Sequence, residues 1–210
     1  MTNKHHIEEI LNGVSHGIAA ISSIIGLILL IIFNNYNQEW GLFSTIIYGM
    51  SLIILYTLSS VYHFVKNKKT KHLFRILDHC SIFILIAGTY TPVVLLAIGG
   101  STGWWIFGIQ WILVLIGCVF KIFYTGKYES ISILIYLLMG WMIVFKWDHL
   151  TKIISNSAFD MLLAGGIIYT IGIIFYLLDS KIRYFHFIWH LFVITGSAIH
   201  YTMIFKYIIR

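Results

Sequence analysis

The sequence predicts an all-α integral membrane protein, a bundle of seven transmembrane helices in one domain. Of its 210 residues, 59% are hydrophobic and only 10% are charged, whereas a soluble domain carries about 25% charged residues. Apolar stretches of membrane-spanning length recur from one end of the chain to the other. Lipid rather than water is therefore the main solvent of this chain, and we expect a multi-pass location in a cell membrane.

A helix needs about 20 mostly apolar residues to cross about 30 Å of hydrocarbon. Seven stretches approach or meet this requirement, and the fifth is the shortest. The predicted spans are 14–33, 42–64, 79–98, 104–124, 131–145, 159–178 and 185–207. The intervening loops are short, so we expect neighbouring helices to pack antiparallel. Residues 1–210 then form a single domain, with residues 1–13 as a short cytoplasmic segment before the first span.

Lysine and arginine are distributed unevenly between the loops, and this bias predicts the orientation. The first and third loops contain neither residue, whereas the even loops are basic through Lys66, Lys68, Lys69, Lys71, Arg75, Lys127, Lys181 and Arg183. The positive-inside rule therefore places the N-terminus and the even loops in the cytoplasm and the C-terminus outside. The net charge of +6 follows from this topology, so we expect no nucleic-acid partner.

Two features inside the spans concern structure rather than chemistry. Pro92, the only proline, is predicted to kink the third span because it removes a backbone donor and crowds the preceding turn. Cys80 and Cys118 lie in apolar segments and form no CxxC pair, which indicates buried thiols without a redox role.

The last span begins with two histidines, His186 and His190, spaced four residues apart. On a helix this spacing places both imidazoles on one face, about one turn apart, where they can reach a single metal ion. Two imidazoles do not complete a metal site, so this pair alone predicts either ligation or hydrogen bonding to neighbouring helices.

The predicted topology brings other polar residues to the same membrane level. His63 ends the second span, Ser59 precedes it on the same helical face, and Asp78 stands at the entrance to the third span. Three imidazoles with a water in the fourth position match a catalytic zinc site, although the ligand type also admits nickel, copper or iron. Asp78 is then placed to orient the water and accept its proton, and Ser59 to hold a substrate carbonyl or support the site.

Each residue also has a purely structural interpretation. Ser59 can bond to the carbonyl of its own helix at Leu55, Asp78 can pair with Arg75 or a loop lysine, and His63 can sit at the interface. Their common depth favours a site. A further set on the first helix, Glu9, Asn12 and His16, has the spacing of one helical face, and we favour packing and hydrogen bonding over ligation for it.

Three spaced motifs together resemble those of the hemolysin III family, which is grouped with the progestin and adipoQ receptors, including the adiponectin receptors. The motifs are Glu9-x-x-Asn12-x-x-Ser15-His16-Gly17, Ser59-x-x-x-His63 with Asp78 downstream, and His186-x-x-x-His190. The resemblance implies a bacterial seven-helix protein that binds zinc near the cytoplasmic face through His63, His186 and His190. It also implies that Asp78 holds the zinc-bound water.

The same resemblance implies a function in lipid chemistry, because the wider superfamily includes the alkaline ceramidases. Ser59 matches the motif serine of that superfamily. The leading hypothesis is a zinc-dependent amidase or esterase that acts on a membrane lipid in membrane homeostasis. The alternatives are a sensor or regulator of membrane state in which zinc is structural, and a pore-forming cytolysin. Membrane lipids are the expected partners, and the sequence predicts no particular oligomeric state.

Overall fold

The computed structural model describes residues 3–210, and every regular element in that range is helical. Seven segments are long and apolar enough to cross a membrane, which confirms the predicted fold class. The elements are α1 (Asn3–Ile32), α2 (Gly41–Phe64), α3 (Lys68–Pro92), the π-helical η1 (Val93–Ile98), α4 (Gly100–Tyr124), α5 (Glu129–Gly140), the 3₁₀-helical η2 (Met142–Lys146), α6 (Trp147–Ile153), α7 (Asn156–Leu178) and α8 (Phe185–Tyr207).

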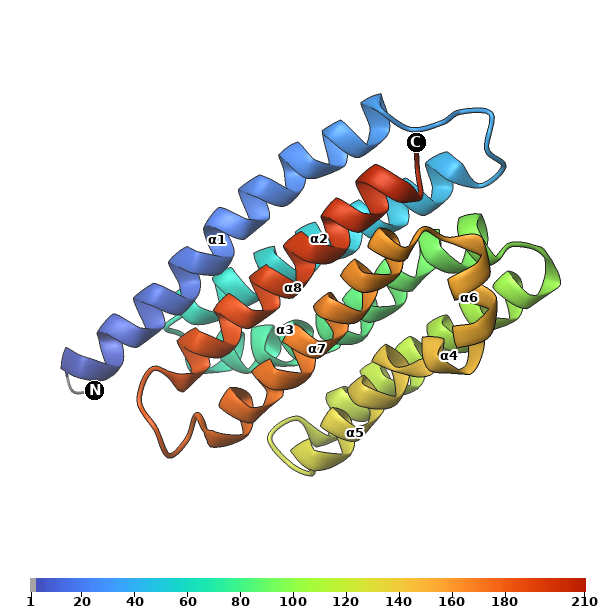
Figure 1. Cartoon of the computed structure of the whole chain (residues 1–210). Helices are drawn as coiled ribbons and strands as arrows, with labels where there is room; N and C mark the ends of the chain where they lie inside the picture. The colour runs from blue at the N-terminus through green and yellow to red at the C-terminus, as the bar shows by residue number, and fades with distance from the viewer. Residues whose placement is uncertain (1–2) are drawn as a thin grey trace.

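The long helices lie side by side as an up-and-down bundle (Figure 1). α1 packs chiefly against α2, α2 against α3, and α7 against α8, and α1 also contacts α8. The first turns of α1 and the α7–α8 loop lie at one end of the bundle and the C-terminus at the other (Figure 1). The start of α8 and the end of α2 therefore share the end of the bundle at which α1 begins.

Two helices begin well before their predicted spans. α1 begins at Asn3 rather than near residue 14, and α3 begins at Lys68 rather than at residue 79. The Asn67 side chain accepts hydrogen bonds from the backbone N–H groups of Lys69 and Thr70, at 3.1 and 3.2 Å, so α3 is N-capped inside the predicted loop. Asp78 consequently lies within α3, about three turns from its start, and not at its entrance.

The third and fifth spans are not continuous α-helices. α3 ends at Pro92 and continues as the π-helical turn η1, so the predicted disturbance at this proline takes the form of a change in hydrogen-bonding pattern. In the fifth span, α5 gives way to η2 and then α6, which extends to Ile153. Much of the predicted loop 146–158 is therefore helical, which corrects the prediction.

The Tyr90 hydroxyl satisfies backbone groups at the break between α5 and η2. It donates to the Gly140 carbonyl and accepts from the Ile143 N–H, both at 2.8 Å, and Tyr90 is buried. Within hydrocarbon no water can replace these bonds. The break in the fifth span therefore depends on a side chain of α3.

We expect Tyr90→Phe to destabilise the protein by about 1–3 kcal/mol, because it removes the hydroxyl that pairs the buried Ile143 N–H and the Gly140 carbonyl. Thermal unfolding in detergent would show this as a melting temperature lowered by several degrees. Tyr36→Phe is the matched control, since its hydroxyl also bonds a backbone carbonyl, Ile31, but is exposed. Equal melting temperatures for the two variants would contradict this role of Tyr90.

Candidate metal centre

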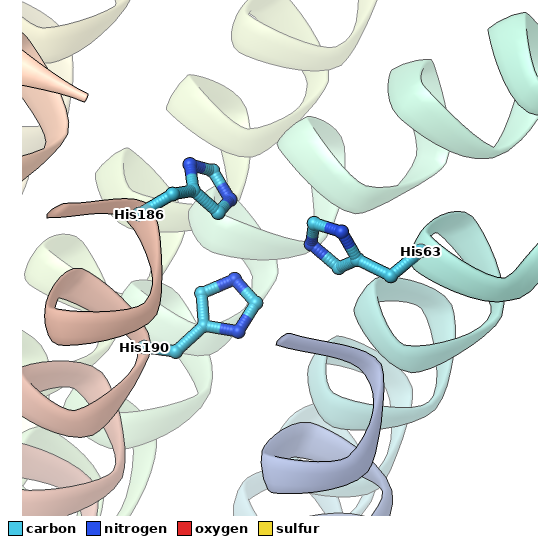
Figure 2. Close-up of side chains that lie close together, drawn as sticks. All are labelled: His63, His186 and His190. Atoms are coloured by element: carbon cyan, nitrogen blue, oxygen red, sulfur yellow. The ribbon is translucent and has the colours of Figure 1, made fainter. Parts of the chain in front are cut away.

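Three histidines from two helices converge at the end of the bundle where α1 begins. His63 lies in the last turn of α2, and His186 and His190 lie in the first two turns of α8. Their rings face a common centre (Figure 2), and one potential ligand atom from each lies within 4.8 Å of those of the other two. The structure thus brings together the three histidines that the sequence predicted as ligands.

Hydrogen bonds identify which ring nitrogen of two histidines is available to an ion. His186 Nδ1 lies 2.8 Å from Asp179 Oδ2, and His190 Nδ1 lies 3.3 Å from the Asn12 carbonyl oxygen. Both oxygens act as acceptors, so Nδ1 of each ring carries the proton and Nε2 is left with a free lone pair. This is the arrangement found around metal-binding histidines, whose second nitrogen donates to a carboxylate or a carbonyl.

His63 has the same orientation but a longer contact. Its Nδ1 lies 3.6 Å from Glu9 Oε1, and its side chain is 2% exposed. Neither ring nitrogen has a hydrogen-bond partner among the described residues. A buried unpaired nitrogen is unfavourable, and an ion at the common centre would provide the missing partner for His63.

The donor set fits a transition-metal ion. Imidazole nitrogen binds zinc, copper, nickel and iron. Two nitrogens bound to one zinc ion lie at most about 4.2 Å apart, twice the bond length of about 2.0–2.1 Å, so small rotations of these side chains suffice to bind an ion. The three histidines can therefore hold a metal ion, with a position open to a further ligand.

A cavity of about 260 Å³ opens beside the histidines, and we call it the vestibule. Its walls are polar and carry both signs of charge. Among the residues that line it are Glu9, His63, Arg75, Asp78, Asp179 and His186. Two of the three predicted metal ligands, His63 and His186, therefore face a polar cavity.

Asp78 and Ser59 lie near each other beside the vestibule. Asp78 lines the cavity, and the buried Ser59 side chain interacts with its carboxyl group. Asp78 is not part of the potential ligand cluster, and no ion pair with Arg75 is among those formed by the described residues. Asp78 therefore lies beside the vestibule without belonging to the potential ligand cluster.

Sequence reasoning missed Asp179, which follows α7 and bonds His186. The available signal was a carboxylate in a very short loop immediately before a helix that begins with histidine. It also left Arg75 without a functional role, although Arg75 lines the vestibule. The spacing of Glu9, Asn12 and His16 was recognised, but not that all three contact the histidine cluster.

Comparisons with known proteins cover almost the whole chain. A family model described as haemolysin-III related matches residues 4–201. The chain belongs to the hemolysin III family. It is 41% identical over 204 residues to the hemolysin-3 homolog of Bacillus subtilis (strain 168), covering 97% of this chain and 95% of the relative. Over 203 residues it is 41% identical to hemolysin-3 of Bacillus cereus, covering 96% and 92%.

The chain also resembles a eukaryotic protein. It is 31% identical over 213 residues to the monocyte to macrophage differentiation factor of Homo sapiens, covering 97% of this chain and 85% of the relative. The predicted relation to both hemolysin III and the adiponectin-receptor-like proteins is thus confirmed. Together with seven apolar spans, the bacterial relatives identify a multi-pass protein of the bacterial cell membrane.

We expect the detergent-purified wild type to hold about one transition-metal ion per chain. His63→Ala and His190→Ala should each lose most of it, because two imidazoles bind an ion far more weakly than three. Elemental analysis measures this directly. His72→Ala, which removes an exposed histidine of α3, should retain the wild-type content, and equal content in all the variants would place the metal elsewhere.

Proposed function

We propose that this protein is a zinc-dependent integral membrane hydrolase that cleaves an amide or ester bond of a membrane lipid. The observation that carries the proposal is the open cluster of three imidazoles, in which His63 and His186 share the wall of the vestibule with Asp78. A structural zinc site is closed by four protein ligands, whereas a catalytic site keeps one position open.

The chain's own residues have distinct roles in this proposal. Zinc, when bound, would act as a Lewis acid and activate water for attack. Asp78 accepts the proton of the attacking water at a carboxylate oxygen and returns it to the leaving group as general acid. Ser59 interacts with the Asp78 carboxyl group and holds it in place for both transfers.

A second cavity supports a lipid as the substrate. It has a volume of about 120 Å³ and almost wholly apolar walls, and its lining includes Leu55, Trp189 and Val193. Trp189 precedes His190 in the chain, and Leu55 lies one turn of α2 from Ser59, so the lining of this cavity includes neighbours of two site residues. It suits an acyl chain, while the vestibule suits the polar part of the same lipid.

The vestibule lies at the same end of the bundle as the basic even loops. The predicted orientation therefore puts it on the cytoplasmic side. Substrate would then enter from the cytoplasmic leaflet. Roles in membrane homeostasis follow from such an activity, because the cleavage releases a fatty acid and changes the lipid composition.

Asp78→Asn should reduce lipid hydrolysis by about 10²–10⁴-fold, the usual contribution of a general base. Its zinc content and melting temperature should remain those of the wild type, because Asp78 is not a ligand in this proposal. Fatty-acid release from a broad lipid panel is the measurement. Asp148→Asn, which alters an exposed carboxylate of α6, is the control and should keep full activity.

The hydrolase proposal fails if zinc-loaded wild type releases no fatty acid from any lipid in the panel while His190→Ala behaves like the wild type in cells.

A specific observation favours one competing function, a membrane-state regulator with structural zinc: the histidines join α2 to α8 and are contacted from α1. In that case Asp78→Asn keeps its cellular function, and only the ligand variants lose thermal stability.

The third candidate is a pore-forming cytolysin, as the names of the bacterial relatives suggest. We expect purified protein to release no dye from liposomes, because a chain with seven apolar spans and short loops has no water-soluble form from which to insert. Fluorescence dequenching of an encapsulated dye checks this. Leakage that rises with protein concentration and persists in His190→Ala would support the pore instead.

A further inference from the structure

We propose that the N-terminal half of α1 and the residue after α7 are positioning elements of the metal centre. Glu9, Asn12 and His16 of α1 and Asp179 would set zinc affinity by fixing the orientation of the three histidines. This inference rests on the metal-binding part of the proposed function. It assigns a role to the first-helix set, for which the sequence favoured only packing and hydrogen bonding.

α1 contributes no residue to the potential ligand cluster, yet it contacts two of the three histidines. Glu9 Oε1 faces Nδ1 of His63 at 3.6 Å, and the Asn12 carbonyl oxygen accepts from Nδ1 of His190 at 3.3 Å. Glu9 and Asn12 are three residues apart and so share one face of the helix. One helical face thus turns Nε2 of two rings, supplied by α2 and α8, toward the common centre.

His16 fixes the plane of the His190 ring, whose rotation is also restricted by its hydrogen bond to the Asn12 carbonyl. Its imidazole stacks on that of His190 with ring centroids 3.6 Å apart and an interplanar angle of 12°. His16 is buried, and neither of its ring nitrogens has a hydrogen-bond partner among the described residues. The Tyr56 ring makes an edge contact with His16, with ring centroids 5.0 Å apart. The contribution of His16 is therefore its flat surface.

Glu9 is itself held by a second contact. Its Oε2 lies 2.6 Å from Nζ of Lys71 on α3, which leaves Oε1 directed at His63. This arrangement allows two interpretations, because Glu9 either orients His63 or only joins α1 to α3 through Lys71. The two differ in their response to loss of Lys71, which removes the link to α3 but leaves the contact with His63.

Asp179 completes the set for the third histidine. It accepts from His186 Nδ1 at 2.8 Å across the short turn between α7 and α8. Each of the three rings thus presents Nδ1 to an oxygen of the protein, two of them carboxylate oxygens. Contacts of this kind fix ring orientation and raise ligand basicity, and losing one weakens metal binding by about 10–100-fold.

The test is zinc affinity of the full-length protein in detergent, measured by competition with a chromophoric chelator. Glu9→Ala and Asp179→Ala should each bind zinc about 10–100-fold more weakly than the wild type. Glu9→Gln and Asp179→Asn keep an oxygen acceptor and should lose less. Melting temperatures of the metal-free proteins, measured in parallel, show whether each variant still folds. If the alanine variants do not fold, the zinc affinities of Glu9→Gln and Asp179→Asn decide the question.

Two matched controls separate positioning from other effects. Glu8 lines the same vestibule one residue away and forms no ion pair with a histidine among the described residues. Glu8→Gln therefore changes the charge without removing such a contact and should bind zinc normally. Lys71→Met should also bind zinc normally. His16→Phe keeps the stacking surface and should bind better than His16→Ala.

Three results would overturn the inference. If Glu8→Gln binds zinc as weakly as Glu9→Gln does, the effect is one of general charge. If Lys71→Met binds zinc as weakly as Glu9→Ala does, Glu9 acts only as a link between helices. Wild-type affinity in folded Glu9 and Asp179 variants would remove the positioning role alone. A wild type that binds no zinc would instead remove the metal site of the proposed function, so the two failures are distinguishable.

Discussion

Hydrocarbon offers no hydrogen bond to a polar group, and this constraint governs where polar side chains of the chain lie. In the spans, many serine and threonine hydroxyl groups are satisfied locally: Ser23 bonds the Ala19 carbonyl and Thr89 the Leu85 carbonyl, both at 2.8 Å. Such bonds need no second helix. The histidines differ because an imidazole cannot be satisfied by its own helix in this way, so their partners must come from neighbouring helices or from a bound ion.

That difference explains why the histidines gather where α1, α2 and α8 meet. The α7–α8 connection is short, which keeps Asp179 beside the first turn of α8. The α2–α3 connection is shorter still, because α3 begins at Lys68, and this holds Asp78 and Lys71 close to the end of α2. Short loops and early helix starts together concentrate polar groups from five helices at one end of the bundle.

Hydropathy was sufficient to predict the seven spans, and the alternating topology was sufficient to predict that His63, His186 and His190 share one level. The helix ends were not predictable in this way. Hydropathy shows which residues suit the hydrocarbon layer, whereas a helix ends where its pattern of backbone hydrogen bonds ends. At α3 the Asn67 cap determines that point. The α5–η2 break was equally inaccessible, since it depends on Tyr90 from a helix far away in the sequence.

Contacts between helices were the least predictable part of the site. The sequence placed Glu9 on the same face of a helix as Asn12, but which neighbour that face meets depends on the rotation of α1 about its own axis. Lipid-facing isoleucines such as Ile18, Ile21 and Ile25, all exposed, indicate the outer side of α1 only after the bundle is assembled. The orientation in the membrane stays a prediction of the basic loops.

At the start of α8, consecutive residues reach different surroundings. Successive residues of a helix point about 100° apart, so neighbours reach different surroundings. His190 joins the imidazole cluster, while Trp189 lines the apolar cavity. A lipid changes from apolar to polar at the bond to its acyl chain, and a site that cleaves this bond needs the same change within a few ångströms. In the proposed reaction, α8 provides that boundary. The oxygens that contact the histidines fix the position of the imidazole rings relative to the apolar cavity.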